Sequence, residues 1–236
     1  MDLITDMERT KEHTKKIFIV GAGPGTPDFI TPIARRTVQN AQLLIGSKRV
    51  LDMLSSEIRG DVLPLDVSNI YSALKKGIEA AKSGRSVVIL STGDPCIFGL
   101  LKPVLKIKDD VEVKVIPGIS SIQTCLARLC LSWDDIGLLI SFHEEISPEK
   151  KERLIEAVRE GKNIVLLPGS KSFHPNKILE FLLEQGVDRA LPATICEKLT
   201  YPEEKIVKGT LESLSKFSFD PLCVMVIEKL RSTQGE

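Results

Sequence analysis

The first half of the chain alternates between short apolar runs and segments with helical periodicity. The apolar runs are rich in β-branched residues and lie at 17–20, 42–46, 61–65, 86–91 and 111–116. The clearest predicted helix covers 70–82 and ends at Ser83-Gly84. Its apolar stripe consists of Ile70, Ala73, Leu74, Gly77, Ile78 and Ala81. Because parallel neighbours need crossover connections, this alternation predicts a parallel five-stranded sheet in an α/β domain.

The alternation of predicted strands and helices changes in the second half, after a junction at 131–135. This junction contains the single tryptophan, Trp133. The expected strands cover 136–141, 163–167, 193–199, 205–208 and 223–228. The expected helices cover 148–160 and 176–185. A short turn at 201–204 separates two of the strands without a helix, which favours antiparallel pairing. The second half is therefore predicted to form a mixed sheet with helices.

These patterns predict two αβα lobes with a ligand-binding cleft between them. The expected division is a leader over 1–15, an N-terminal domain over 16–132, a C-terminal domain over 133–230 and a tail over 231–236. Ligands of parallel α/β sheets collect beyond the carboxyl ends of the strands. The loops at that edge are therefore the first place to look for chemistry.

Three glycine-containing loops follow predicted strands of the first half. They read Gly21-Ala22-Gly23-Pro24-Gly25, Ser91-Thr92-Gly93-Asp94-Pro95 and Pro117-Gly118-Ile119-Ser120-Ser121. Taken singly, the second loop is typical of a helix start, with Asp94 as N-cap and Pro95 at the first helical position. Ser120 or Ser121 would likewise cap the helix that runs to Cys130. Together, at one sheet edge, the loops favour a shared small-molecule site, because glycine permits close backbone approach.

The first loop does not match the dinucleotide fingerprint G-x-G-x-x-G. The position of the third glycine holds Thr26, and Pro24 has no N–H to offer a pyrophosphate. The next predicted strand runs into Gly46-Ser47-Lys48, without the carboxylate that holds a ribose. A nicotinamide-dependent oxidoreductase is therefore a disfavoured alternative.

Charge and apolar content narrow the class of protein. The chain has 32 basic and 32 acidic residues, a balance that argues against a nucleic-acid or membrane-surface binder. No apolar run approaches the roughly 20 residues of a membrane span. The stretch 1–16 is polar and charged, without an apolar signal segment. We therefore expect a cytoplasmic protein without nucleic-acid or membrane partners.

The cysteines and histidines give little support for a metal site. The five cysteines lack C-x-x-C spacing and are expected to be buried thiols in a reducing compartment; they are Cys96, Cys125, Cys130, Cys196 and Cys223. The three histidines are His13, His143 and His174. No metal is therefore expected.

The three loops, in this order and spacing, resemble those of the tetrapyrrole methyltransferases that use S-adenosylmethionine. The resemblance extends from Ile17 to Lys229 and implies a tetrapyrrole substrate and a homodimer. Shorter pieces are similar to the branch that methylates C-5 of cobalt-precorrin-7: 45–51, Trp133-Asp134-Asp135, Ser141-Phe142-His143 and Glu197-Lys198-Leu199. Methylation at another corrin position, diphthine synthesis and a non-catalytic domain that senses the cofactor remain alternatives.

The resemblance also implies a set of cofactor contacts. They are Pro24, Gly93, Asp94, Ile97, Ser120, Ser121, Leu167 and Leu222. Asp94 is expected either to attract the amino or sulfonium charge or to serve only as the helix cap. Methyl transfer from a sulfonium depends on in-line placement, and orientation can supply about 7–11 kcal/mol of such a barrier. No catalytic base is therefore nominated.

Substrate contacts are predicted at two places. Ser47, Lys48 and Arg49 would meet the carboxylates of a tetrapyrrole, or else form a solvated first helical turn. His143 would orient the macrocycle or carry a proton, or else be a hydrogen-bonded structural residue. The branch usually has Gly-Arg where this chain has Glu144-Glu145, and an acidic residue where it has Pro168-Gly169. These departures concern substrate contacts more than cofactor contacts.

Overall fold

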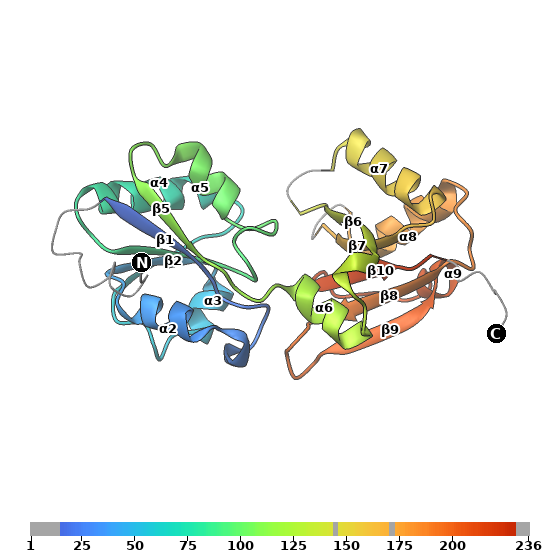
Figure 1. Cartoon of the computed structure of the whole chain (residues 1–236), viewed down its shortest axis with the longest axis horizontal. Helices are drawn as coiled ribbons and strands as arrows, with labels where there is room; N and C mark the ends of the chain where they lie inside the picture. The colour runs from blue at the N-terminus through green and yellow to red at the C-terminus, as the bar shows by residue number, and fades with distance from the viewer. Residues whose placement is uncertain (1–14, 144–145, 170–172, 230–236) are drawn as a thin grey trace. The chain divides into compact units, whose positions relative to one another are not determined.

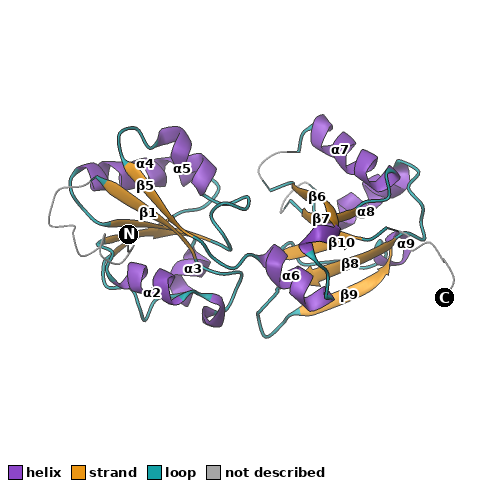
Figure 2. Ribbon diagram, in the orientation of Figure 1, coloured by secondary structure: helices purple, strands orange, loops and turns teal. Residues whose placement is uncertain are grey.

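The computed structural model of the chain describes residues 15–143, 146–169 and 173–229. The chain forms two compact units, 1–120 and 121–236 (Figures 1 and 2). Helix α6 (Ser121–Leu129) belongs to the second unit, where it packs against the last strand. The division therefore falls before α6, whereas the pattern of the sequence favoured 132/133.

The first unit contains the predicted parallel five-stranded sheet. Its strand order is β3-β2-β4-β1-β5, which places β1 between β4 and β5. The strands are β1 (Lys16–Gly21), β2 (Leu43–Gly46), β3 (Asp61–Pro64), β4 (Val87–Ser91) and β5 (Glu112–Ile116). In register, Ile19 of β1 lies opposite Ile89 of β4 and Val115 of β5. The carboxyl ends of these three strands are therefore neighbours.

The alternation along β1 explains how the sheet is covered on both faces. Phe18 and Val20 pack with one pair of helices, and Ile17 and Ile19 pack with the other pair. The first pair is α2 (Pro32–Gln39) and α3 (Lys48–Met53), and the second is α4 (Ile70–Lys82) and α5 (Leu101–Ile107), as Figure 1 shows. A short 3-10 helix, η1 (Pro27–Phe29), precedes α2. The N-cap of α2 is Thr31, whose Oγ1 accepts a hydrogen bond from the Ala34 N–H at 3.3 Å.

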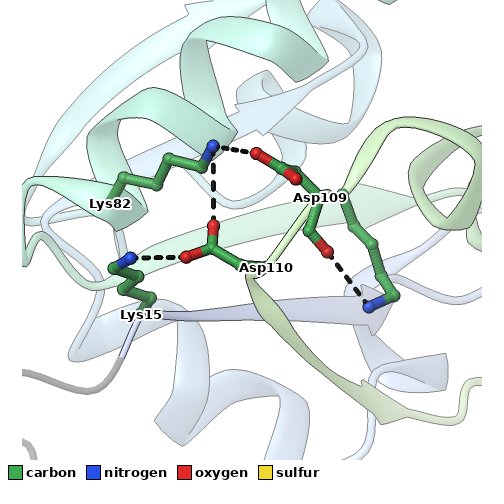
Figure 3. Close-up of polar contacts among 5 residues, drawn as sticks. Lys15, Lys82, Asp109 and Asp110 are labelled. Atoms are coloured by element: carbon green, nitrogen blue, oxygen red, sulfur yellow. Dashed lines mark hydrogen bonds and ion pairs between the residues drawn. The ribbon is translucent and has the colours of Figure 1, made fainter.

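Charged side chains gather at the amino end of this sheet (Figure 3). Lys15 Nζ lies 2.5 Å from Asp110 Oδ2, and Lys82 Nζ lies 3.5 Å from Asp110 Oδ1. Lys82 also pairs with Asp109. We call Lys15, Lys82, Asp109 and Asp110 the amino-end network. It joins the start of β1, the end of α4 and the turn before β5.

The second unit contains a mixed sheet, as predicted. Its order is β6-β7-β10-β8-β9, with β6 and β7 parallel and the other neighbours antiparallel. The strands are β6 (Ile136–Ser141), β7 (Asn163–Leu167), β8 (Pro192–Glu197), β9 (Lys205–Thr210) and β10 (Cys223–Ile227). The remaining helices are η2 (Trp133–Asp135), α7 (Pro148–Arg159), α8 (Pro175–Glu184) and α9 (Leu211–Leu214).

One apolar core holds this second unit together. It includes Phe142, Leu166, Leu179 and Met225, all nearly inaccessible to solvent. The rings of Phe142 and Phe173 meet edge to face, with 4.8 Å between centroids. Helix α9 has only four residues and was not expected, because so short an element leaves no periodic signal.

The cysteines are partly as expected. Cys125, Cys196 and Cys223 are buried, and the Sγ atoms of Cys125 and Cys196 lie 3.5 Å apart. Burial raises the pKa of the Cys223 thiol. The expectation that all five are buried is wrong for Cys96 and Cys130, which are exposed. Both lie where the chain turns, next to loop or helix ends, so the apolar character of their sequence neighbours does not bury them.

Within the described ranges, no helix is long and apolar enough to span a bilayer.

Candidate functional site

Three loops meet at the carboxyl edge of the first sheet. We call them loop 1 (22–26), loop 2 (92–99) and loop 3 (117–120). The Gly93 N–H donates to the Gly23 carbonyl at 2.8 Å, and the Ala22 N–H donates to the Ser91 carbonyl at 2.9 Å. Gly23 and Gly93 thereby form an isolated antiparallel bridge between loops 1 and 2. The strand order brings the three loops together, and these bonds join loop 1 to loop 2 and to the end of β4.

Glycines make the close approach of the loops feasible. A Cβ on Gly21 would lie 2.5 Å from the Gly118 Cα and 2.7 Å from the Gly93 carbonyl oxygen. A Cβ on Gly118 would lie 2.4 Å from that same oxygen. Backbone therefore packs directly on backbone, and any side chain at these positions would separate the loops. Gly93 itself has φ +66°, a conformation that favours glycine.

Asp94 connects loop 2 to loop 3. Its side chain is buried, with a residue exposure of 8%. Asp94 Oδ1 accepts a hydrogen bond from the Cys96 N–H at 2.7 Å, and Oδ2 accepts one from the Gly118 N–H at 3.0 Å. The expectation of a helix cap is wrong, because α5 begins only at Leu101 with Leu100 as its N-cap. A tight turn fills the intervening residues, and Phe98 within it has φ +52°.

The other cofactor residues predicted in this part of the chain lie in or next to the same loops. Pro24 is buried in loop 1, and Ile97 is half-buried in loop 2. Ser120 is buried at the end of loop 3, and Ser121 is the first residue of α6. The structure therefore brings Pro24, Gly93, Asp94, Ile97 and Ser120 to one edge of the first sheet.

The predicted substrate residues Ser47, Lys48 and Arg49 open α3 after β2. Arg49 Nη2 donates a hydrogen bond to Thr92 Oγ1 at 3.1 Å, so its guanidinium reaches loop 2. Ser47 is the N-cap residue, but its Oγ makes no cap hydrogen bond and is a buried atom without a partner. Lys48 is exposed. For all three residues, a substrate contact and a solvated first helical turn both stay predictions.

In the second unit, the predicted residues gather at one edge of the mixed sheet. Leu167 ends β7, and its carbonyl accepts a hydrogen bond from the Phe142 N–H at 2.9 Å. His143 follows with an exposed side chain, and its N–H donates to Ser141 Oγ at 3.3 Å. Leu222 precedes β10 and is 39% exposed. Because β10 runs antiparallel to β7, its start lies at the end of β7. Glu144 and Glu145 lie outside the described residues.

The segment before Leu222 depends on two charged residues that the sequence did not single out for this role. Glu197 is 7% exposed, and its Oε1 accepts a hydrogen bond from the Asp220 N–H at 2.5 Å. Lys198 Nζ lies 3.3 Å from Asp220 Oδ2, and the Lys198 N–H donates to the Leu222 carbonyl at 2.8 Å. In the sequence, the run Glu197-Lys198-Leu199 points to these two residues only through the resemblance to the branch. No sequence signal singles out Thr92.

No cluster of three His, Cys, Asp or Glu side chains suited to a metal ion occurs among the residues that the structure describes. Pro168 and Gly169, which replace the acidic residue of the branch, are buried after β7. A Cβ on Gly169 would lie 2.8 Å from the Phe142 carbonyl oxygen, so this position is packed against backbone. The arrangement can hold an organic ligand through backbone groups, hydroxyls and apolar walls.

Comparison with known proteins identifies the family. The profile of the Tetrapyrrole (Corrin/Porphyrin) Methylases matches residues 16–215. A relative from Methanocaldococcus jannaschii, named probable cobalt-precorrin-7 C(5)-methyltransferase, is 35% identical over 90% of this chain and 97% of its own.

Two solved structures share the fold. The cobalamin biosynthesis precorrin-6Y methylase from Archaeoglobus fulgidus is 25% identical, with a TM-score of 0.68 over 92% of this chain and 99% of that chain. Uroporphyrin-III C-methyltransferase from Thermus thermophilus, in complex with S-adenosylhomocysteine, is 22% identical, with a TM-score of 0.71 over 90% and 92%. The chain therefore belongs to the tetrapyrrole methylases and is a methyltransferase that uses S-adenosylmethionine.

Proposed function

We propose that this chain methylates C-5 of cobalt-precorrin-7 in cobalamin biosynthesis. The observation that carries the proposal is the 35% identity, over nearly the full length of both chains, to the probable C(5)-methyltransferase of M. jannaschii. The A. fulgidus methylase, whose name places it in cobalamin biosynthesis, supports that pathway for this chain as well.

The cofactor is proposed to rest on loops 1, 2 and 3 of the first unit. Leu167 and Leu222, which belong to the second unit, stay predicted contacts. The residues fit such a ligand, because the glycines let the three loops pack backbone against backbone and so bring them to one sheet edge. Half-buried Ile97 offers an apolar wall, and Ser120 and Ser121 offer hydroxyls. S-adenosylmethionine supplies an activated sulfonium methyl group when bound. The task of the chain is then orientation, which can supply about 7–11 kcal/mol.

Arg49 and His143 are proposed to bind the tetrapyrrole. Arg49 is positioned by Thr92, next to Gly93, so its guanidinium can pair with a substrate carboxylate near loop 2. His143 has an exposed side chain, and its backbone N–H is bonded to Ser141. It can orient the macrocycle or carry a proton. Lys48 is exposed and can add a further positive charge.

The test is a methylation assay with cobalt-precorrin-7 and S-adenosylmethionine carrying a ¹³C-methyl group. We expect a mass gain of one methylene and an NMR signal at C-5. A panel with earlier corrin intermediates, metal-free precorrin and the diphthamide-bearing translation factor covers the alternatives. Methylation only at another ring position, or only of the translation factor, would contradict the proposal.

A homodimer is proposed as the active form, and light scattering of the purified protein tests it.

A further inference from the structure

We infer that Asp94 is a positioning residue, whose carboxylate fixes loop 2 to loop 3 and so shapes the cofactor site, and that it does not act as a charge partner of the cofactor. The inference rests on the proposed location of the cofactor at these loops. It does not depend on which ring position receives the methyl group.

Both oxygens of the Asp94 carboxylate are already occupied by hydrogen bonds within the protein. Each oxygen of Asp94 accepts a backbone N–H of the protein, from Cys96 at 2.7 Å and from Gly118 at 3.0 Å. The residue is 8% exposed. A carboxylate that already receives amide hydrogen bonds on both oxygens within the protein is stabilised without a cation. Its negative charge therefore needs no ligand to balance it.

The hydrogen bond from the Gly118 N–H to Asp94 Oδ2 holds loop 3 against loop 2. Loops 2 and 3 touch through glycine backbone, with Gly118 set against Gly21 and the Gly93 carbonyl. Such contacts contain no side chains to interdigitate, so dispersion forces alone hold them weakly. The Asp94 carboxylate adds a charge-assisted hydrogen bond across the same gap. Removing it leaves the Gly118 N–H without its acceptor and frees loop 3 to move away from Gly93.

The two roles of Asp94 predict different affinities for three ligands. S-adenosylmethionine carries a sulfonium and an amino group, S-adenosylhomocysteine keeps only the amino group, and 5′-methylthioadenosine has neither charge. A charge partner would matter for the charged ligands alone. A residue that shapes the loops would matter for all three by the same factor.

The experiment is calorimetric titration of the three ligands into the wild-type protein and Asp94→Asn, at a temperature where circular dichroism shows the variant folded. Asparagine keeps the size of the side chain, but its NH₂ group faces a donor at Cys96 or Gly118. We expect the Kd of all three ligands to rise by a common factor of about ten, as for loss of one buried hydrogen bond. A loss confined to the charged ligands, or no loss, would overturn the inference.

Two further variants complete the test. Asp94→Glu keeps the charge but moves the carboxylate by one methylene, so we expect the same common loss; wild-type affinity would overturn the inference. Val104→Ala removes a buried side chain of α5 and serves as a destabilised control. Its ligand affinities should stay at the wild-type level, and an equal loss there would mean that Asp94 acts only through general stability. A protein that binds cofactor but leaves cobalt-precorrin-7 unmethylated would contradict the proposed function instead.

Discussion

The two ends of the first sheet use carboxylates in opposite ways. At the amino end, Asp109 and Asp110 pair with lysine side chains in open solvent (Figure 3). At the carboxyl end, Asp94 is buried and held by backbone amides. Exposed ion pairs are screened and contribute little, whereas a buried donor or acceptor that loses its partner is costly. Geometric constraint is therefore concentrated at the end of the sheet that carries the proposed cofactor site.

The largest expected effect is that of Gly118→Ala. The added methyl would lie 2.4 Å from the Gly93 carbonyl oxygen, which is backbone and cannot rotate away. We expect a loss of about 2–3 kcal/mol in the free energy of unfolding, together with weaker cofactor binding. Urea denaturation and calorimetry measure the two effects.

Gly84→Ala is the matched control at the amino end. Gly84 has φ +88°, but a Cβ there meets nothing within 4 Å. Only backbone strain remains, about 1–2 kcal/mol, and cofactor affinity should be unchanged. If Gly84→Ala were the more damaging variant, the contrast between the two ends would fail.

A smaller effect is expected for the stability of Asp94→Asn. One of its two amide donors, from Cys96 or Gly118, would face the new NH₂ group, which costs about 1–2 kcal/mol. Thermal and urea unfolding of the variant, beside the wild type, measure the change. Unaltered unfolding would show that the two hydrogen bonds contribute nothing net.

The next effect concerns substrate binding by Arg49. In Arg49→Lys the planar guanidinium that donates to Thr92 Oγ1 is replaced by a point charge. We expect the KM for the tetrapyrrole to rise several-fold, at a cost of about 1 kcal/mol, with a smaller change in kcat. Lys48→Ala, at the exposed neighbouring position, should change KM less. Equal KM values for wild type and Arg49→Lys would remove Arg49 from the substrate site.

The smallest effect is expected in the amino-end network. The hydrogen bond from Lys15 holds the pKa of Asp110 below its usual value, and the bond to Asp109 raises the pKa of Lys82. The contribution of Asp110 to the stability of the folded state is present above its unfolded pKa and is lost as the pH falls through its folded pKa. That of Lys82 is present below its unfolded pKa and is lost as the pH rises through its folded pKa.

Asp110→Asn tests this network. Because the side chains are exposed, we expect little change in Tm at neutral pH, and any change should shrink further in high salt. Melting curves of the variant and the wild type, at low and high salt and across acid pH, provide the measurement. A large, salt-resistant loss of Tm would show a structural constraint at the amino end as well. It would contradict the claim that the constraint is concentrated at the carboxyl end of the sheet.

Much of the architecture was predictable from local pattern. The strand β4 and the helix α4 were expected within a residue or two, because apolar periodicity and the Ser83-Gly84 stop are local signals. The alternation of strands and helices likewise predicted the parallel sheet. The spacing of the loops around Gly23, Gly93 and Gly118 indicated the family, which the comparisons confirm.

The meeting of the three loops at one sheet edge was predictable from the sequence, but the contacts of their residues were not. The sequence alone determined which segments form strands, which loops carry glycine, and the resemblance to a family of methyltransferases. Only the tertiary structure decided that β1 lies between β4 and β5, that Asp94 accepts from Gly118, and that Arg49 reaches Thr92. These pairings join residues 24 and 43 positions apart, and they depend on which crossover each helix makes. Periodicity and turn chemistry act over a few residues, so they specify elements, while packing specifies their partners.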